Sequence, residues 1–183
     1  MALTEKHYAE LKKELDECNN PLFMHDDDPD GFASFLLFYR YKREGMGFPI
    51  KASPIIDEKF LRKVEEYNPD KIFILDIPMV RQEFVDAVKV PIVWVDHHGP
   101  FEIKGVKYFN PRLYNKDSIF STSYNCYKVV KEDIWIAMIG IVGDWQLFDD
   151  VAADLREKYP DLLPIEIKKP EDALFNSKIG TLV

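Results

Sequence analysis

Short apolar segments alternate with helical segments along most of the chain, and this alternation restricts the fold more than any other feature. Residues 71–76 (KIFILD) and 91–95 (PIVWV) are rich in β-branched and aromatic side chains, which predicts two strands buried on both faces. Residues 3–18 place apolar side chains at the three- and four-residue spacing of a helix. Strands that alternate with helices predict an α/β fold, in which a parallel β-sheet carries helices on both faces.

The same two periods assign the other elements. Further strands are expected at 22–24, 48–56 and 106–109. Helices are expected at 31–43, 57–67, 81–88 and 118–130. Residues 134–142 are apolar on all sides, so they predict a buried helix rather than another strand.

The pattern weakens after Asp149. Pro160, Pro164 and Pro170 punctuate a polar stretch there, so 151–183 is expected to be a linker that follows a domain spanning 1–150. The last residues look like the start of another element, which leads us to expect a truncated product.

Composition excludes several classes of protein. Because 46% of the 183 residues are apolar and 14% are aromatic, the chain can fill a core and is not disordered. No apolar run approaches the roughly 20 residues of a membrane span, and the N-terminus lacks the apolar core of a signal peptide. A cytoplasmic protein without membrane contact is therefore expected. Cys18 and Cys126 form no CxxC pair and are expected to be buried thiols.

The net charge of −8 argues, taken alone, against a broad nucleic-acid surface. The acidic residues are not spread evenly, however, because four of them crowd into 26–30 (DDDPD). Such crowding is compatible with a solvated loop or with a cation site, where a bound metal reverses the local sign.

Three of the expected strands end in acidic or imidazole side chains. In chain order these residues are Asp26, Asp28, Asp30, Asp76, Asp96, His97 and His98. Each group alone also fits a turn, a helix cap or a structural histidine pair. Because the carboxyl ends of parallel strands line one crevice, their convergence favours a ligand site. Asp144 follows the buried helix and can join them.

The types of side chain restrict the ligand to certain metals. The acidic run is not an EF-hand loop, since the twelfth position counted from Asp26 is Leu37 rather than a glutamate. Carboxylates with one or two imidazoles suit Mn²⁺, and Mg²⁺ less well, while zinc is disfavoured. The carboxylates exceed what one ion needs, which favours two ions about 3.5–4 Å apart and therefore phosphoester hydrolysis.

Four segments together resemble a known family. HDDDPDGFAS, FILDIP, VDHHGP and GIVGDW are similar, in order and spacing, to the four motifs of the DHH phosphoesterase superfamily, and most of all to RecJ-like nucleases of the archaeal type. The resemblance covers roughly 21–150. It implies that 1–150 is a Rossmann-like DHH catalytic domain, and that 151–183 leads toward a C-terminal DHH-associated domain missing from this chain.

The resemblance also implies a set of metal ligands. The first ion would be held by Asp26, Asp28 and Asp76. The second would be held by Asp30, His97, Asp144 and again Asp76, which makes Asp76 the bridge. His25 lies three residues before Asp28 and is an alternative to Asp26, although the register favours Asp26.

Two further residues would act in catalysis. The resemblance implies that His98 faces the scissile phosphate and that Asp96 orients the imidazoles. The segment Ser121-Thr122-Ser123, which opens a helix between the third and fourth motifs, also resembles the family, and its simplest interpretation is an N-cap. Trp145 could stack a base or lie in the core. Four basic residues could meet a phosphate backbone or form a solvated loop: Lys104, Lys107, Arg112 and Lys116.

The expected function is that of a metal-dependent phosphodiesterase. The resemblance implies a RecJ-like exonuclease in DNA repair, which hydrolyses single-stranded DNA or RNA from an end through a hydroxide activated by two metal ions. Its partners would be single-stranded nucleic acid and replication or repair proteins. One alternative is a small-substrate phosphoesterase: a nanoRNase or nucleotide phosphatase, a cyclic-dinucleotide phosphodiesterase, or a manganese pyrophosphatase. The other is a non-catalytic scaffold at a replication fork.

Overall fold

A five-stranded, fully parallel sheet forms the centre of the computed structural model, which describes residues 3–51 and 54–183. Its strands, in spatial order, are β2 (Met46–Ile50), β1 (Pro21–Asp26), β4 (Lys71–Leu75), β6 (Ile92–Val95) and β7 (Val106–Phe109). A small second sheet pairs β3 (Ile55–Ile56) with β5 (Met79–Val80). The predicted α/β fold with a parallel sheet is confirmed.

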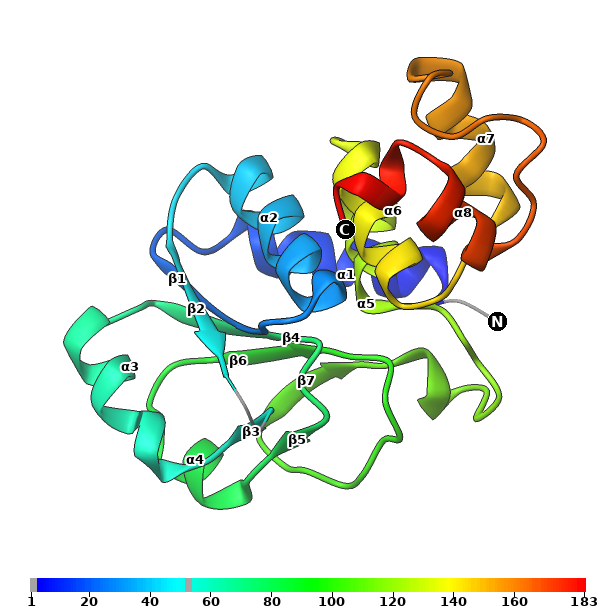
Figure 1. Ribbon diagram of the computed structural model, residues 1–183. Coiled ribbons are helices and arrows are strands. Elements are labelled where there is room, and N and C mark those ends of the chain that lie inside the picture. The colour runs from blue at the N-terminus through cyan, green and yellow to red at the C-terminus, as the bar shows by residue number, and fades with distance from the viewer. Residues whose placement is uncertain (1–2, 52–53) are drawn as a thin grey trace.

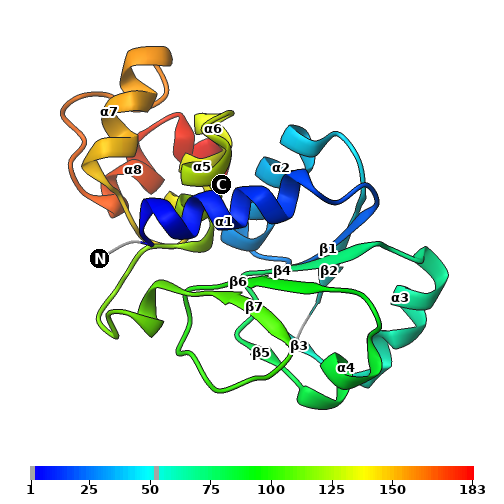
Figure 2. The ribbon, with the colours of Figure 1, turned by 180° about the vertical axis from the view of Figure 1, so that it is seen from behind.

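Helices cover both faces of this sheet (Figures 1 and 2). On one face lie α1 (Glu5–Asp16), α2 (Pro29–Lys42), α5 (Thr122–Val130) and α6 (Ile134–Gly143). On the other lie the small sheet, α3 (Leu61–Tyr67), which follows a 3-10 turn (Glu58–Phe60), and α4 (Gln82–Ala87). No helix of the described residues is long and apolar enough to cross a bilayer.

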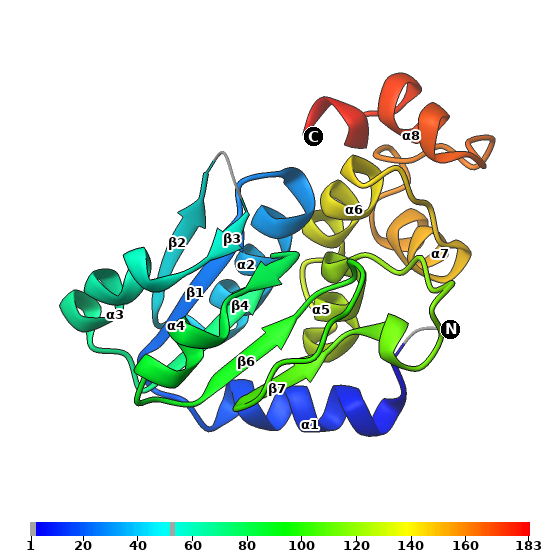
Figure 3. The same ribbon diagram turned by 90° about the horizontal axis from the view of Figure 1, so that it is seen from below.

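Alternation along the strands divides the core into two clusters. Phe23 and Phe73 pack under α2, whereas their strand neighbours Met24 and Ile72 pack with Trp94 in the cluster on the opposite face. Successive side chains of a strand point to opposite faces, so each central strand contributes to both clusters. The strands run in one direction, toward the side of the molecule where α5 and α6 lie (Figure 3).

The strand expected at 48–56 is wrong in its extent. The structure instead contains β2, which ends at Ile50, and a separate short strand β3, which belongs to the second sheet. Residues 52–53, which fell inside the expected strand, lie outside the described residues. Pro54 stands directly before β3 and has no backbone N–H to continue a ladder, which explains the division.

The irregular structure expected after Asp149 is also wrong. This part of the chain forms α7 (Asp149–Lys158), α8 (Pro170–Asn176) and a 3-10 turn (Ile179–Thr181). Leu155 and Ala173 are buried in the same core as α6, and Arg156 donates hydrogen bonds to the carbonyls of Leu163 and Ile167. The assignment of 151–183 as a link to a DHH-associated domain stays a prediction.

Close packing between α6 and its neighbours sets the position of α5. A Cβ atom added at Gly140 would lie 2.5 Å from Ser123 Oγ and 2.8 Å from Ala33 Cβ. Only a residue without a side chain therefore allows α6 to approach both α5 and α2 this closely.

Gly140→Ala should lower the free energy of unfolding by about 1–3 kcal/mol, because overpacking forces the neighbouring helices apart. Denaturant unfolding would measure the change. The matched control is Gly99→Ala, since an added Cβ there meets nothing within 4 Å. Equal stability of the two variants would contradict this account of the packing.

Candidate metal centre

The turn from β1 into α2 carries the first three of the predicted metal ligands. Asp26 ends β1, and Asp28 is the N-cap of α2, where its side chain accepts a hydrogen bond from the Gly31 amide at 2.8 Å. Asp30 lies in the first turn of the helix and is 1% exposed. A Cβ at Gly31 would lie 2.7 Å from the Asp26 carbonyl oxygen, so this tight turn depends on glycine.

The N-terminus of α5 holds the Asp30 carboxylate. The amides of Thr122 and Ser123 donate to its two oxygens at 2.8 and 2.9 Å, and the Ser123 hydroxyl donates as well. Free backbone amides and the helix dipole favour a negative charge at this position. Ser121 is the N-cap of α5, as expected, and accepts from the Tyr124 amide.

Asp76 follows β4 in a left-handed conformation, with φ of 60°. This backbone conformation costs on the order of 1–3 kcal/mol for a residue other than glycine. It directs the Asp76 side chain toward the site. The carboxylate accepts a hydrogen bond from the Thr122 hydroxyl at 2.8 Å. Burial, followed by the charges of Asp30 and Asp28, raises the pKa of Asp76 well above its usual value.

His97 lies at the centre of the cluster. Its Nε2 is 3.4 Å from an oxygen of Asp76 and 4.0 Å from one of Asp30, while its Nδ1 is 3.7 Å from Asp144. Burial lowers the pKa of His97, which favours the neutral imidazole that binds metals. Four of the residues predicted to be ligands, from four separate segments, thus converge on one point.

Asp144 is held from the end of α6. Gln146 Nε2 donates to its carboxylate at 2.6 Å, and the Oε1 of the same glutamine accepts from the Ser121 amide at 3.0 Å. Burial, with the charges of Asp30 and Asp28, raises the pKa of Asp144 to about 7. The glutamine therefore links the carboxylate at the end of α6 to the start of α5.

The residues expected to hold a first metal are less closely gathered. Among the described residues, ligand atoms lie within 4.8 Å of one another in two sets, Asp76–His97–His98 and Asp30–His97–Asp144. Asp26 instead accepts a hydrogen bond from the Asp27 amide, and burial raises its pKa to about 6. The roles of Asp26 and Asp28 as ligands stay predictions.

His25 points into the aromatic side of α2. Its ring stacks on Phe35 with centroids 4.7 Å apart and planes 4° apart. Its Nδ1 lies 2.6 Å from the carbonyl oxygen of Asp26. These contacts favour His25 as a neighbour of the site, which is the position that the register of the motif gives it.

Asp96 is fully buried, and its carboxylate is hydrogen-bonded to the imidazole of His98. Its carboxylate lies 2.8 Å from His98 Nδ1. It also accepts hydrogen bonds from the His98 amide at 3.1 Å, from Asn110 Nδ2 at 3.1 Å and from the Tyr108 hydroxyl at 3.2 Å. The hydrogen bond to Asp96 raises the pKa of His98. When the ring is protonated, Nδ1 donates to Asp96 and the Nε2–H of this half-exposed ring is left free to donate to another group.

Sequence reasoning missed the side chains that hold the carboxylates. The hydroxyls of Thr122 and Ser123, and the amides of Asn110 and Gln146, carry no metal-ligand signature. One signal was present for Asn110, because it follows β7 at the same edge as Asp76 and Asp96. Thr122 and Ser123 lie in a segment that the sequence did single out, but their hydrogen bonds to Asp76 and Asp30 join segments far apart in the chain and were not predicted.

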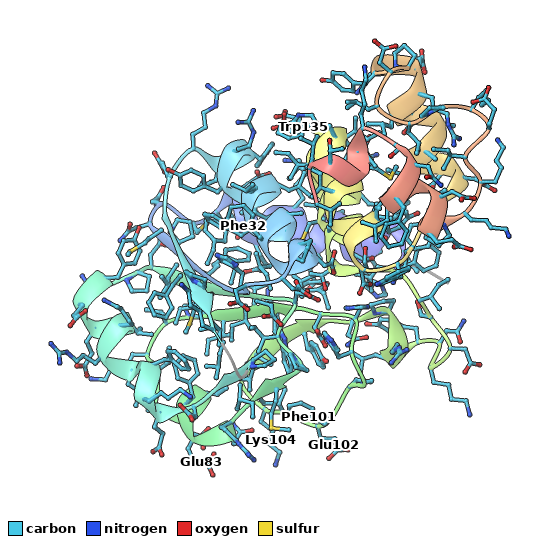
Figure 4. The ribbon with its side chains drawn as sticks, viewed as in Figure 1. Phe32, Glu83, Phe101, Glu102, Lys104 and Trp135 are labelled. Atoms are coloured by element: carbon cyan, nitrogen blue, oxygen red, sulfur yellow. The ribbon has the colours of Figure 1, made fainter. Side chains whose placement is uncertain are left out.

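The basic residues after His98 lie in different places. The charge of Arg112 acts on His97, where it helps to lower the pKa, and its Nε donates to the Ser118 carbonyl. Lys107 instead pairs with Glu14 of α1. Lys104 lies with Phe101, Glu102 and Glu83 at the edge away from the helical layer that carries Phe32 and Trp135 (Figure 4).

The charge of the cluster fits a cation. Of the ion pairs among the described residues, those of Asp30, Asp76, Asp96 and Asp144 are all with histidine. Burial, followed by the charges of neighbouring carboxylates, raises the pKa values of Asp76 and Asp144. A metal ion would stabilise these buried carboxylates by supplying the missing positive charge. Oxygen donors with imidazole suit Mn²⁺, and Mg²⁺ to a lesser degree.

Asp96→Asn should lower the pKa of His98, because the hydrogen bond to the carboxylate is the main cause that raises it. The change keeps the shape of the side chain and removes its charge. NMR titration of the histidine ring protons in the metal-free protein would measure it, with His7 of α1 as an internal control. An unchanged His98 titration would show that Asp96 does not set the state of this ring.

The fold is similar to that of solved DHH-domain structures. No protein-family model and no curated protein matches the chain. Solved structures do match this chain, and one of them is the exonuclease RecJ bound to manganese. The match has 14% sequence identity and a TM-score of 0.58, and it covers 77% of this chain and 43% of that chain. The chain therefore has the RecJ-like fold of a DHH domain, as the motifs imply.

Two other structures share the fold. A DHH domain described as a member of a family of ribosomal proteins covers 92% of this chain and 48% of its own, with 15% identity and a TM-score of 0.64. CDC45 from Entamoeba histolytica covers 78% of this chain and 34% of its own, with 13% identity and a TM-score of 0.53. The chain spans less than half the length of each of these three structures.

Proposed function

We propose that this protein is a metal-dependent phosphodiesterase of the RecJ-like type, which hydrolyses single-stranded DNA or RNA from an end. The observation that carries the proposal is the gathering of Asp30, Asp76 and Asp144 around His97, beside the Asp96–His98 pair. The likeness to an exonuclease structure bound to manganese supports both the chemistry and the metal. Replication or repair proteins are proposed as partners.

Two divalent ions, preferably Mn²⁺, would be held by the carboxylates and His97. Asp26, Asp28 and Asp76 would hold one ion. Asp30, His97, Asp144 and the shared Asp76 would hold the other. Such a pair of ions supplies a hydroxide at neutral pH and neutralises charge on the phosphate.

The protein's own groups position these ligands and the substrate. Thr122 and Ser123 hold the carboxylates of Asp76 and Asp30 by direct hydrogen bonds, so that they need not reorganise during the reaction. Asp96 accepts the Nδ1 proton of His98 and keeps that ring protonated to a higher pH than usual. The free Nε2–H of His98 would then donate to a non-bridging oxygen of the scissile phosphate.

The shared role of Asp76 gives a test by metal titration. Asp76→Ala should abolish tight binding of both ions, whereas Asp144→Ala should weaken mainly one. The loss at Asp76 should exceed the roughly 10–100-fold that removal of an outer partner costs. Calorimetric titration with Mn²⁺ would measure the number of sites and their affinities.

Asp161→Ala is the matched control for this titration, because it removes the same charge from an exposed loop position. It should bind both ions as the wild type does. Two ions retained in Asp76→Ala with near-native affinity would contradict the bridging role.

The activity itself is tested with Mn²⁺ on end-labelled single strands of DNA and RNA of several lengths, with pyrophosphate and cyclic dinucleotides alongside. We expect shortening of the strands from one end, the 5′ end by the RecJ resemblance. His98→Gln should reduce the rate by about 10²–10³-fold, as the loss of one donor to a developing charge does.

Other outcomes would favour the alternatives. Turnover of the small substrates alone would indicate a small-substrate phosphoesterase. Binding of a strand without hydrolysis at any Mn²⁺ concentration would indicate a scaffold.

A further inference from the structure

Two large aromatic side chains stand exposed beside the carboxylate cluster. Trp145 directly follows Asp144 and is 58% exposed, and Phe175 of α8 is 71% exposed. Their rings lie 5.9 Å apart at an interplanar angle of 63°. They meet because α8 packs beside α6, whose end carries Trp145 (Figure 1). The expectation that Trp145 either stacks a base or lies in the core is thereby narrowed, because it is not a core residue.

The backbone around Trp145 explains why its ring points outward. Its φ is +55°, and its amide donates to the Val142 carbonyl at 3.0 Å, while the next amide, of Gln146, donates to Ile141 at 2.9 Å. This sharp turn brings the side chains of Asp144 and Gln146 together on one side of the chain. A left-handed residue is usually glycine or asparagine, so an exposed tryptophan here carries a backbone cost without gaining burial.

We propose that Trp145 and Phe175 form a stacking platform for a nucleobase of the strand whose phosphate reaches the metal centre; this rests on the proposed function. A base stacked on one ring meets the edge of the other, since the two planes are far from parallel. Trp145 directly follows Asp144, a proposed metal ligand, so the platform would serve a nucleotide close to the metal centre.

The charge of the protein favours stacking as a source of affinity. A net charge of −8 provides few contacts for a phosphate backbone, and of the basic residues after His98 it is Arg112 whose charge reaches the cluster. Base–aromatic stacking needs no cation, and it tolerates any sequence because every base has a π face. The platform therefore favours a substrate that carries a base, here a nucleic-acid strand, over a phosphate ester without a base.

The test compares binding of a thymidine oligonucleotide with binding of an abasic strand of equal length, with Ca²⁺ in place of Mn²⁺. The wild type should prefer the thymidine strand. Trp145→Ala and Phe175→Ala should each reduce that preference by about fivefold or more, the lower end of what loss of one stacked base costs. Ile165→Ala, which removes an apolar side chain that is 62% exposed, is the matched control and should keep the wild-type preference.

Tryptophan fluorescence of the wild-type protein gives a second readout, which does not depend on whether an alanine variant folds correctly. Of the three tryptophans, Trp94 is buried, Trp135 is partly buried and Trp145 is 58% exposed. The thymidine strand should quench a fraction of the emission that the abasic strand leaves unchanged, and this difference should disappear in Trp145→Ala. Equal quenching by both strands, or an unchanged preference in both alanine variants, would overturn the platform.

Cleavage by the wild type with Mn²⁺ is measured separately. Cleavage without base preference rejects only the platform, whereas base preference without cleavage rejects only the proposed phosphodiesterase.

Discussion

Burial of several carboxylates at one edge of the sheet is the constraint on which the rest of the structure depends. Asp30, Asp76 and Asp96 are each no more than 1% exposed. Buried like charges oppose one another, so each needs donors fixed on a neighbouring element. The start of α5 supplies them to Asp30 and Asp76, and the segment after β7 supplies them to Asp96.

This requirement connects the helical layer to the site. At Gly140, α6 approaches both α2 and the start of α5 so closely that a Cβ atom would have no room. The same helix α6 ends at Asp144, whose carboxylate is tied back to the start of α5 through Gln146. Packing of the core and placement of the carboxylates are thus set by the same contacts, and a change in the distance between helices alters both.

Much of the fold and most of the cluster could be predicted because both follow from short-range rules. Buried parallel strands are recognisable from runs such as 71–76, and the carboxyl ends of such strands meet, which located Asp76 and His97. The helix α7 escaped prediction because its apolar side is narrow and the charges around Leu155 conceal it. The hydrogen bonds of Thr122 and Ser123 to Asp30 escaped prediction because that residue is about ninety positions away in the chain.

The acidic composition, which first argued against nucleic acid, is consistent with a nucleic-acid substrate once the positions of the charges are considered. The carboxylates that oppose a phosphate at the site are those that a divalent ion would neutralise, and a bound cation reverses the sign of the local potential. The hydrogen bond to Asp96 raises the pKa of His98, which favours a positive donor at the same edge. The proposed metal ions would therefore be needed before this site attracts a phosphate. Affinity for the rest of a strand must then come from groups that do not depend on charge, which is the role that exposed aromatic rings can fill.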